Sequence, residues 1–240
     1  MYIYGKHSIR TALKHHRGLV RRIYHEPGKD ASATFGGLIL EIETEEVAKW
    51  RLDQFAKGGN NQGFVAELER FPLLGERELR ADAASLKEAL ILIADGILDP
   101  RNLGAMIRTL VAAGGFGIIV PQDRSAPISG ATVHASAGCA FLTKIYQVKN
   151  LVRSIGYLKD AGFWIFGLDP QSTTSLVGFD FPQKTGIVVG SEEMGMRRLV
   201  RKACDELLRI PQVGRVQSLN ASVAAALALY EYARARNILK

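Results

Sequence analysis

The sequence predicts an α/β protein whose larger part, residues 88–240, is a mostly parallel sheet with helices on both faces. Runs of consecutive apolar residues recur there, as in strands buried on both faces. Stretches with helical spacing separate most of these runs. The 240-residue chain has 47% hydrophobic and 23% charged residues, which is the composition of a globular protein long enough for two modest domains.

A small α/β unit is predicted for residues 1–71, because helix-like and strand-like stretches alternate there. Ile9 and Leu13 lie at helical spacing among basic residues. Thr44 is followed by two glutamates, which predicts the start of a second helix. The predicted order is a helix over 5–16, a strand over 19–25, a helix from Thr44, a turn at 58–61 and a strand over 62–68. Residues 72–87 have mixed charge and little periodicity, and they predict a linker with one helical turn near its end.

The larger part is predicted to hold six strands and four helices. The strands are expected at 90–94, 117–120, 144–148, 164–168, 186–189 and 206–210. The helices are expected at 103–113, 151–161, 196–204 and from about residue 220 to 236. The last helix is rich in alanine, and because small residues permit close approach, this helix is expected to pack tightly against a neighbouring part of the protein.

The composition also limits the function. A net charge of +7 and an isoelectric point near 9.5 favour a polyanionic partner such as a nucleic acid. No apolar run approaches the ~20 residues of a membrane span, and residues 1–10 lack a signal-peptide core, so a cytoplasmic protein is predicted. Cys139 and Cys204 fit neither a metal-ligand spacing nor a disulfide framework, so reduced structural thiols and no metal are expected.

Three loops follow predicted strands at the carboxyl edge of the sheet, where ligands bind to such folds. The first, residues 95–104, leads into a helix that carries Arg108. Pro100 disfavours helix before it, so Asn102 is expected to cap that helix. On spacing alone, a capped helix with a surface arginine explains this loop better than a binding site does.

The second loop, residues 190–195, reads Gly-Ser-Glu-Glu-Met-Gly. Its two glycines let the backbone turn tightly and approach a neighbour closely. It is neither a GxxxxGK[ST] phosphate loop nor a GxGxxG fingerprint, so a nicotinamide-dependent Rossmann enzyme is not indicated. Its two glutamates favour a cationic or hydroxyl-rich ligand, although an acidic helix N-terminus has the same pattern.

The third segment, residues 210–222, leaves the last predicted strand at Ile210 and Pro211. Ser218 and Asn220 then open the final helix. On the residues alone, Ser218 is an ordinary N-cap, which is the default interpretation of a serine at this position.

Together these segments resemble the three signature motifs of the SPOUT methyltransferases, SpoU/TrmH-type branch. The residues that carry the resemblance are Asn102-Leu103-Gly104 with Arg108, Gly190-Ser191-Glu192 with Gly195, and Ile210-Pro211 with Ser218-Leu219-Asn220. In the first half, Tyr4-Gly5-Lys6-His7 and residues 62–66 are similar to the ends of the L30e-like substrate domain of bacterial 23S rRNA guanosine 2′-O-methyltransferases. Departures are Asn61 in place of a histidine, Phe141 in place of an acid, and a short stretch at 31–42.

The resemblance implies a trefoil-knotted sheet over 88–240, an L30e-like domain over 1–71 and a homodimer with the C-terminal helix near its interface. It implies S-adenosylmethionine as the cofactor, contacted around Gly190, Ile210, Ser218 and Leu219. The implied reaction is 2′-O-methylation of a guanosine ribose in 23S rRNA, in the peptidyl-transferase region, on free rRNA or on a pre-ribosomal particle. The alternatives are the same chemistry on tRNA or another rRNA ribose, and a non-catalytic RNA-binding ribosome-assembly factor.

The catalytic residues implied are Asn102, Arg108, Glu192, Ser218 and Asn220. In relatives the arginine that matches Arg108 is often given the role of base. A guanidinium with a pKa above ~12 hardly deprotonates, so we expect Arg108 to bind a phosphate and stabilise the developing alkoxide. The two asparagines would orient these groups, Glu192 would position Arg108 or the ribose, and Ser218 would hydrogen-bond within the cofactor pocket.

Basic side chains gather near one helix and strand of the first half. The resemblance places an RNA-binding domain there, and it favours RNA contact over an ordinary solvated face. The candidate RNA-binding residues are Lys6, Arg10, Lys14, Arg17, Arg21 and Arg22.

Overall fold

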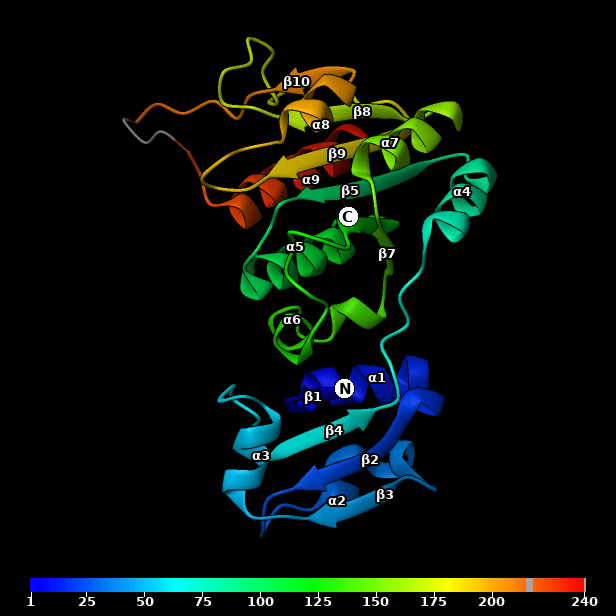
Figure 1. Cartoon of the computed structure of the whole chain (residues 1–240), viewed down its shortest axis with the longest axis vertical. Coiled ribbons are helices and arrows are strands. Elements are labelled where there is room, and N and C mark those ends of the chain that lie inside the picture. Colours follow the sequence, from blue (N-terminus) through cyan, green and yellow to red (C-terminus); the bar gives the residue numbers. More distant parts are fainter. Residues whose placement is uncertain (215–217, 240) are drawn as a thin grey trace. The chain divides into compact units, whose positions relative to one another are not determined.

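The chain folds into two compact units in the computed structural model, which describes residues 1–214 and 218–239 (Figure 1). The first comprises Met1–Pro72 with Pro127–Leu142, and the second comprises Leu73–Ala126 with Thr143–Lys240. The segment 127–142 therefore packs with the N-terminal unit, although it lies within the predicted methyltransferase domain. Among the described residues, no helix is both long and apolar enough to span a membrane.

The first unit is built on a four-stranded sheet in the order β1-β4-β2-β3. β4 runs antiparallel to β1 and β2, whereas β3 is parallel to β2. The strands are β1 (Tyr2–Tyr4), β2 (Val20–His25), β3 (Glu43–Glu46) and β4 (Phe64–Leu68). The helices are α1 (Lys6–His16), α2 (Ala31–Phe35), α3 (Lys49–Phe55) and α6 (Gly130–Ala135), with short 3-10 turns at Arg17–Leu19, Gly36–Ile39 and Cys139–Phe141.

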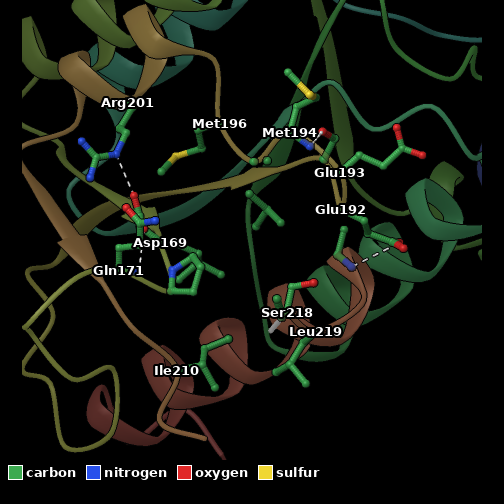
Figure 2. Close-up of a pocket in the computed structure, with 18 of the residues that line it drawn as sticks. Asp169, Gln171, Glu192, Glu193, Met194, Met196, Arg201, Ile210, Ser218 and Leu219 are labelled. Carbon is green, nitrogen blue, oxygen red and sulfur yellow. Dashed lines mark hydrogen bonds and ion pairs between the residues drawn. The ribbon is translucent and has the colours of Figure 1, made fainter. Parts of the chain in front are cut away.

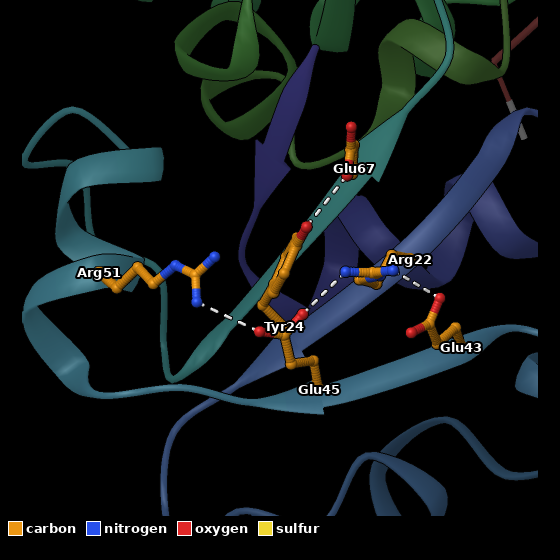
Figure 3. A network of polar contacts seen from close by, with 6 residues as sticks. All are labelled: Arg22, Tyr24, Glu43, Glu45, Arg51 and Glu67. Atoms are coloured by element: carbon orange, nitrogen blue, oxygen red, sulfur yellow. Dashed lines mark hydrogen bonds and ion pairs between the residues drawn. The ribbon is translucent and has the colours of Figure 1, made fainter.

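The helix predicted from Thr44 is wrong, because Glu43–Glu46 forms the edge strand β3 and the helix starts only at Lys49. Arg22 on the neighbouring strand donates to Glu43 at 2.7 Å and to Glu45 at 2.9 Å (Figure 3). These cross-strand ion pairs favour the extended backbone over the helix that the local pattern predicted.

Two of the three departures from the family pattern, Asn61 and Phe141, make structural contacts within the first unit. Asn61 is buried, donates to Asp53 at 2.8 Å and accepts from the Gly63 amide at 2.8 Å, which fixes the turn before β4. Phe141 is also buried, and its ring lies 5.0 Å from that of Phe71. Both positions therefore serve packing and turn formation in this chain.

The second unit contains a six-stranded, fully parallel sheet in the order β10-β8-β9-β5-β6-β7. All six predicted strands are confirmed. They are β5 (Ala89–Asp95), β6 (Gly117–Pro121), β7 (Lys144–Val148), β8 (Trp164–Leu168), β9 (Lys184–Gly190) and β10 (Glu206–Leu208). The helices are α4 (Glu76–Ser85), α5 (Pro100–Ala112), α7 (Leu151–Asp160), α8 (Arg198–Ala203) and α9 (Ala221–Ala235).

Helices cover both faces of this sheet, as expected. Ile91 and Ile93 of β5 join a buried cluster with α4, α7 and α8. Because successive side chains of a strand point to opposite faces, Leu90 and Leu92 point to the other face, where α5 and α9 pack together. β5 is buried along its whole length, which explains its continuous apolar sequence.

The predicted linker is wrong in one respect, because it contains the ten-residue helix α4. Leu79 and Ala83 are fully buried against the sheet cluster. Asp82 anchors the helix to β7 by accepting from Lys144 at 2.6 Å and from the Tyr146 hydroxyl at 2.5 Å. These long-range contacts, which the local sequence does not reveal, order the stretch.

The first strand of this sheet in the sequence, β5, lies in the interior of the strand order. The chain adds β6 and β7 on one side of β5 and then returns to place β9 on the other side. β5 and β9 pair over seven residues, with Asp95 opposite Gly190 at their carboxyl ends. A reversal of this kind opens a crevice outside the strand ends, which is where ligands bind to open parallel sheets. The implied trefoil knot stays a prediction.

Candidate active site

A cavity of about 540 Å³ lies outside the carboxyl ends of β8, β9 and β10 (Figure 2). Small-molecule sites usually measure about 300–1,000 Å³. Three segments at the ends of these strands line it together with Arg201 of α8: Leu168, Asp169, Pro170 and Gln171; residues 189–196; and Leu208, Ile210, Gln212, Ser218, Leu219, Ala221 and Ala224. Residues 215–217 of the third loop lie outside the described residues. The cavity therefore includes all four expected cofactor-contact residues: Gly190, Ile210, Ser218 and Leu219.

The second loop folds back on itself over the end of β9. Ser191 and Gly195 exchange backbone hydrogen bonds of 3.2 and 2.9 Å, and Gly195 has a φ of +62°. A side chain on Gly190 would place its Cβ 2.2 Å from the carbonyl carbon of Gly195. Glycine at position 190 is therefore required by the close approach of the loop backbone.

Three of the predicted catalytic side chains form one hydrogen-bonded group. The Asn102 amide donates to Glu192 Oε1 at 2.7 Å, and the Asn220 amide donates to the same oxygen at 2.6 Å. Asn220 also donates to Asn102 Oδ1 at 3.1 Å. The three residues come from α5, the loop after β9 and the start of α9, so the fold joins all three sequence motifs.

The helix caps differ from the expectation and explain how these side chains become free. Asp99 caps α5 by accepting from the Arg101 amide at 2.8 Å, so the predicted cap at Asn102 is wrong. Asn220 is the cap of α9, through its Oδ1, and its amide nitrogen remains available for Glu192. Ser218 is not the cap, and its side chain makes no hydrogen bond to another described residue where it lines the cavity.

Arg108 stands apart from this group. Its side chain is exposed on α5 and forms no hydrogen bond or ion pair with any described residue. Ala105 and Thr109, on the same helix, line an apolar groove against α9. The expected contact between Glu192 and Arg108 is therefore not formed within the described part of the chain.

Sequence reasoning missed two ion pairs at the strand ends. Asp169, directly after β8, accepts from Arg201 Nε at 2.7 Å within the cavity (Figure 2). Asp95, the last residue of β5, accepts from Arg197 Nε at 2.6 Å. A charged residue that ends a wholly apolar strand was the available signal in both cases.

The cavity has a mixed electrostatic character. Asp169, Glu192 and Glu193 contribute carboxylates, and Arg201 is the cationic side chain among its described lining residues. This arrangement suits a ligand that carries both positive and negative charge, with apolar walls for a ring system. Within residues 1–214 and 218–239, no group of three or more His, Cys, Asp or Glu side chains is arranged to hold a metal ion.

Cys204 directly follows α8 and does not line the cavity. Burial raises the pKa of its thiol to about 12, so the thiolate does not form at neutral pH. This environment is that of an unreactive structural thiol, as the sequence suggested.

Two family descriptions match the chain. Residues 89–230 match the SpoU rRNA Methylase family. Residues 2–74 match the RNA 2′-O ribose methyltransferase substrate-binding family.

Individual relatives match almost the whole length. The 23S rRNA (guanosine-2′-O-)-methyltransferase RlmB of Vibrio vulnificus is 34% identical over 239 residues, which are 98% of this chain and 97% of the relative. The crystal structure of the SpoU methyltransferase AviRb from Streptomyces viridochromogenes in complex with AdoMet is 25% identical with a TM-score of 0.78, covering 100% of this chain and 91% of that one. The A. aeolicus TrmH/SpoU tRNA modifying enzyme is 28% identical with a TM-score of 0.58, covering 68% of this chain and 83% of that one.

The close approach at Gly190 gives the first prediction. Gly190→Ala should lower the free energy of unfolding by about 1–3 kcal/mol, because the added methyl group displaces the loop backbone. Urea denaturation measures the loss, and amide hydrogen exchange at Ser191 and Gly195 locates it. Gly214→Ala is the control, since a Cβ there meets no atom of the described residues within 4 Å. Equal losses in the two variants would contradict the prediction.

Proposed function

The chain belongs to the SpoU rRNA methylase family, and we propose that it methylates the ribose 2′-hydroxyl of a guanosine in 23S rRNA with S-adenosylmethionine as the methyl donor. The observation that carries the proposal is the convergence of Asn102, Glu192 and Asn220 beside a cavity of mixed charge. The similarity to a 23S rRNA enzyme along 98% of the chain supports the choice of substrate.

The cavity fits this cofactor in size and chemistry. Its carboxylates suit the sulfonium and ammonium groups, and apolar side chains such as Ile210 and Leu219 suit the adenine ring. Arg201 binds Asp169 through Nε, and its other guanidinium nitrogens, which bind no described residue, suit the carboxylate. When bound, the cofactor supplies an electrophilic methyl group. The proposed contacts are Gly190, Ile210, Ser218 and Leu219, which all line the cavity.

The asparagines and Glu192 orient the ribose in the proposed reaction. Both side-chain amides donate to Oε1 of Glu192, as does the Ala221 backbone amide at 3.4 Å. Oε2 of Glu192 receives no hydrogen bond from the described residues, so it remains to accept one from a ribose hydroxyl. Holding the attacking oxygen in line with the methyl group is the main contribution of such a site.

Arg108 adds a positive charge to the proposed site. Its exposed guanidinium has no partner among the described residues, so it is available to an RNA phosphate and to the negative charge that develops on the ribose oxygen. Its proposed role is therefore to bind and stabilise negative charge, since a guanidinium is poorly suited to act as a base.

The first unit is proposed to bind the RNA, and the ion pairs within it favour some of the candidate residues over others. Lys6, Arg10 and Lys14 on α1 are exposed and have no acidic partner among the described residues. Each of the other candidates faces a glutamate: Arg17 faces Glu41, Arg21 faces Glu69, and Arg22 faces both Glu43 and Glu45. The hydrogen bond to Glu43 raises the pKa of Arg22, so that cation is already compensated within the protein. α1 is therefore the favoured contact.

A homodimer is proposed through the second unit. Val223, Leu227 and Tyr230 of α9 are each more than 40% exposed. They line the apolar groove against α5 that includes Ala105 and Thr109. An exposed apolar surface on adjacent helices supports burial against a second copy of the chain.

The choice of rRNA over tRNA rests on the first unit. The tRNA modifying enzyme from A. aeolicus matches 68% of this chain, whereas the rRNA enzyme from V. vulnificus matches 98% of it, including the substrate-binding region.

A non-catalytic assembly factor is disfavoured, because the polar group of Asn102, Glu192 and Asn220 is complete. Both a pre-ribosomal particle and free rRNA are compatible with the proposal, and either would place the protein in the cytoplasm.

Mapping of 2′-O-methyl groups tests the function directly. The purified protein, incubated with 23S rRNA and S-adenosylmethionine, should add one methyl group to a guanosine ribose, and the same site should be unmethylated in cells that lack the protein. A parallel incubation with bulk tRNA serves as the control. Methylation of tRNA with none on 23S rRNA would contradict the choice of substrate.

Arg108→Lys should lower kcat by about 100-fold, because a lysine cannot reproduce the planar, bidentate contact of a guanidinium with a phosphate or developing alkoxide. Single-turnover methylation at saturating cofactor and RNA measures it. Arg101→Lys is the matched control, since Arg101 is also an exposed arginine on α5. Near-normal turnover of Arg108→Lys would exclude the bidentate role.

The contrast between free and paired cations gives a further prediction for the first unit. Lys14→Ala should weaken RNA binding and reduce the slope of log affinity against log salt by about 1, as expected for the loss of one phosphate contact. Arg22→Ala should leave the slope unchanged, because Arg22 is paired with Glu43 and Glu45. Filter binding at several salt concentrations measures both, and equal slopes for Lys14→Ala and the unmodified protein would contradict the proposed contact.

A further inference from the structure

Asp95 is a buried charge at the end of an apolar strand. Its side chain is 0% exposed, and burying a carboxylate is costly unless hydrogen bonds and an opposite charge compensate it. Both come from one residue: Asp95 Oδ2 accepts from the Arg197 backbone amide at 2.7 Å, and Oδ1 accepts from Arg197 Nε at 2.6 Å. The carboxylate is thus bound to the backbone and the side chain of a single distant residue.

The Asp95–Arg197 pair lies next to both ends of the segment that contains the second loop. Asp95 is opposite Gly190 in the sheet, and Gly190 is where the loop leaves β9. Arg197 lies directly before α8 and ends the longer loop 190–197, which contains the second loop. The loop is therefore fixed at its first end by the sheet and at its last end by Asp95. Between the two ends lie Glu192, which binds the two asparagines, and Met196, which lines the cavity.

We propose that Asp95 is a positioning residue that acts through Arg197 to hold the loop 190–197 in the shape that binds the cofactor and directs Glu192 toward Asn102 and Asn220. The inference rests on the proposed function. A charge-assisted hydrogen bond to a buried carboxylate is strong enough to order a loop before the ligand arrives. Without it, part of the binding free energy of the cofactor would be spent on ordering the loop.

The chain contains a comparable carboxylate at the opposite edge of the sheet, although its side chain is 22% exposed. Asp205 also accepts from a backbone amide, that of Ile165 at 2.8 Å, and pairs with a cation, Lys159 at 2.7 Å. Ile165 lies at the amino end of β8, whereas the cavity lies beyond its carboxyl end at Leu168. Asp205 therefore offers the same type of interaction without any connection to the loop.

The experiment compares Asp95→Asn with Asp205→Asn in the full-length protein. Asp95→Asn should weaken binding of S-adenosylmethionine in calorimetry by ~10-fold or more, as loss of a charge-assisted hydrogen bond would. It should also accelerate amide exchange across residues 191–196. At saturating cofactor, kcat should recover to within about threefold of the unmodified enzyme while KM for the cofactor stays raised. Asp205→Asn should lower the melting temperature but change neither cofactor affinity nor loop exchange.

A purely structural role would give a different result. If Asp95→Asn and Asp205→Asn affect cofactor affinity equally, the positioning role is overturned. Should Asp95→Asn fail to fold, Arg197→Met replaces it, and Arg197→Lys, which keeps the backbone hydrogen bond and a positive charge, should recover part of the affinity. If the unmodified protein binds no S-adenosylmethionine, the proposed function fails, and unchanged loop exchange in Asp95→Asn would separately overturn the positioning role.

Discussion

The pairing of β5 with β9 is the constraint on which the rest of the site depends. The two strands are far apart in sequence, yet they lie side by side over seven residues with Asp95 opposite Gly190. Their carboxyl ends therefore open into two loops that start next to each other. Every long-range polar contact between the first and second loops, from Asp95 to Arg197 and from Asn102 to Glu192, spans this junction. A different strand order would separate these groups.

Glu192 converts this proximity into a connected site. One of its oxygens accepts hydrogen bonds from α5 and from the start of α9. Asn220 caps α9 with its oxygen and binds Glu192 with its nitrogen, so the helix start and the loop are coupled through a single side chain. Because Asn102 of α5 and Asn220 at the start of α9 bind the same oxygen of Glu192, displacement of the loop would break contacts with both helices. The site is therefore ordered as a unit before any ligand binds.

The sequence allows the large sheet to be predicted because its strands are buried on both faces and have apolar side chains at successive positions. Among the elements that were not predicted, β3 and α4 have weaker patterns. β3 is an exposed edge strand held by ion pairs between Arg22 and its glutamates, and α4 buries only Leu79 and Ala83. The motifs identified the residues Asn102, Glu192 and Asn220, but they did not predict how these bind one another. That pattern depends on Asp99 being the cap of α5, which leaves Asn102 free, and on a strand order that no local signal encodes.

The separation of Arg108 from this preformed group divides the proposed reaction into two parts. Asn102, Glu192 and Asn220 are already in place, whereas Arg108 has no anionic partner among the described residues. In the proposed reaction its partner is the phosphate or alkoxide of the substrate, which would couple stabilisation of the alkoxide to RNA binding. Oε1 of Glu192 is already bound to the side-chain amides of both asparagines. The carboxylate then serves to orient the hydroxyl, and since Glu192 is exposed, solvent can take the proton as the methyl group is transferred.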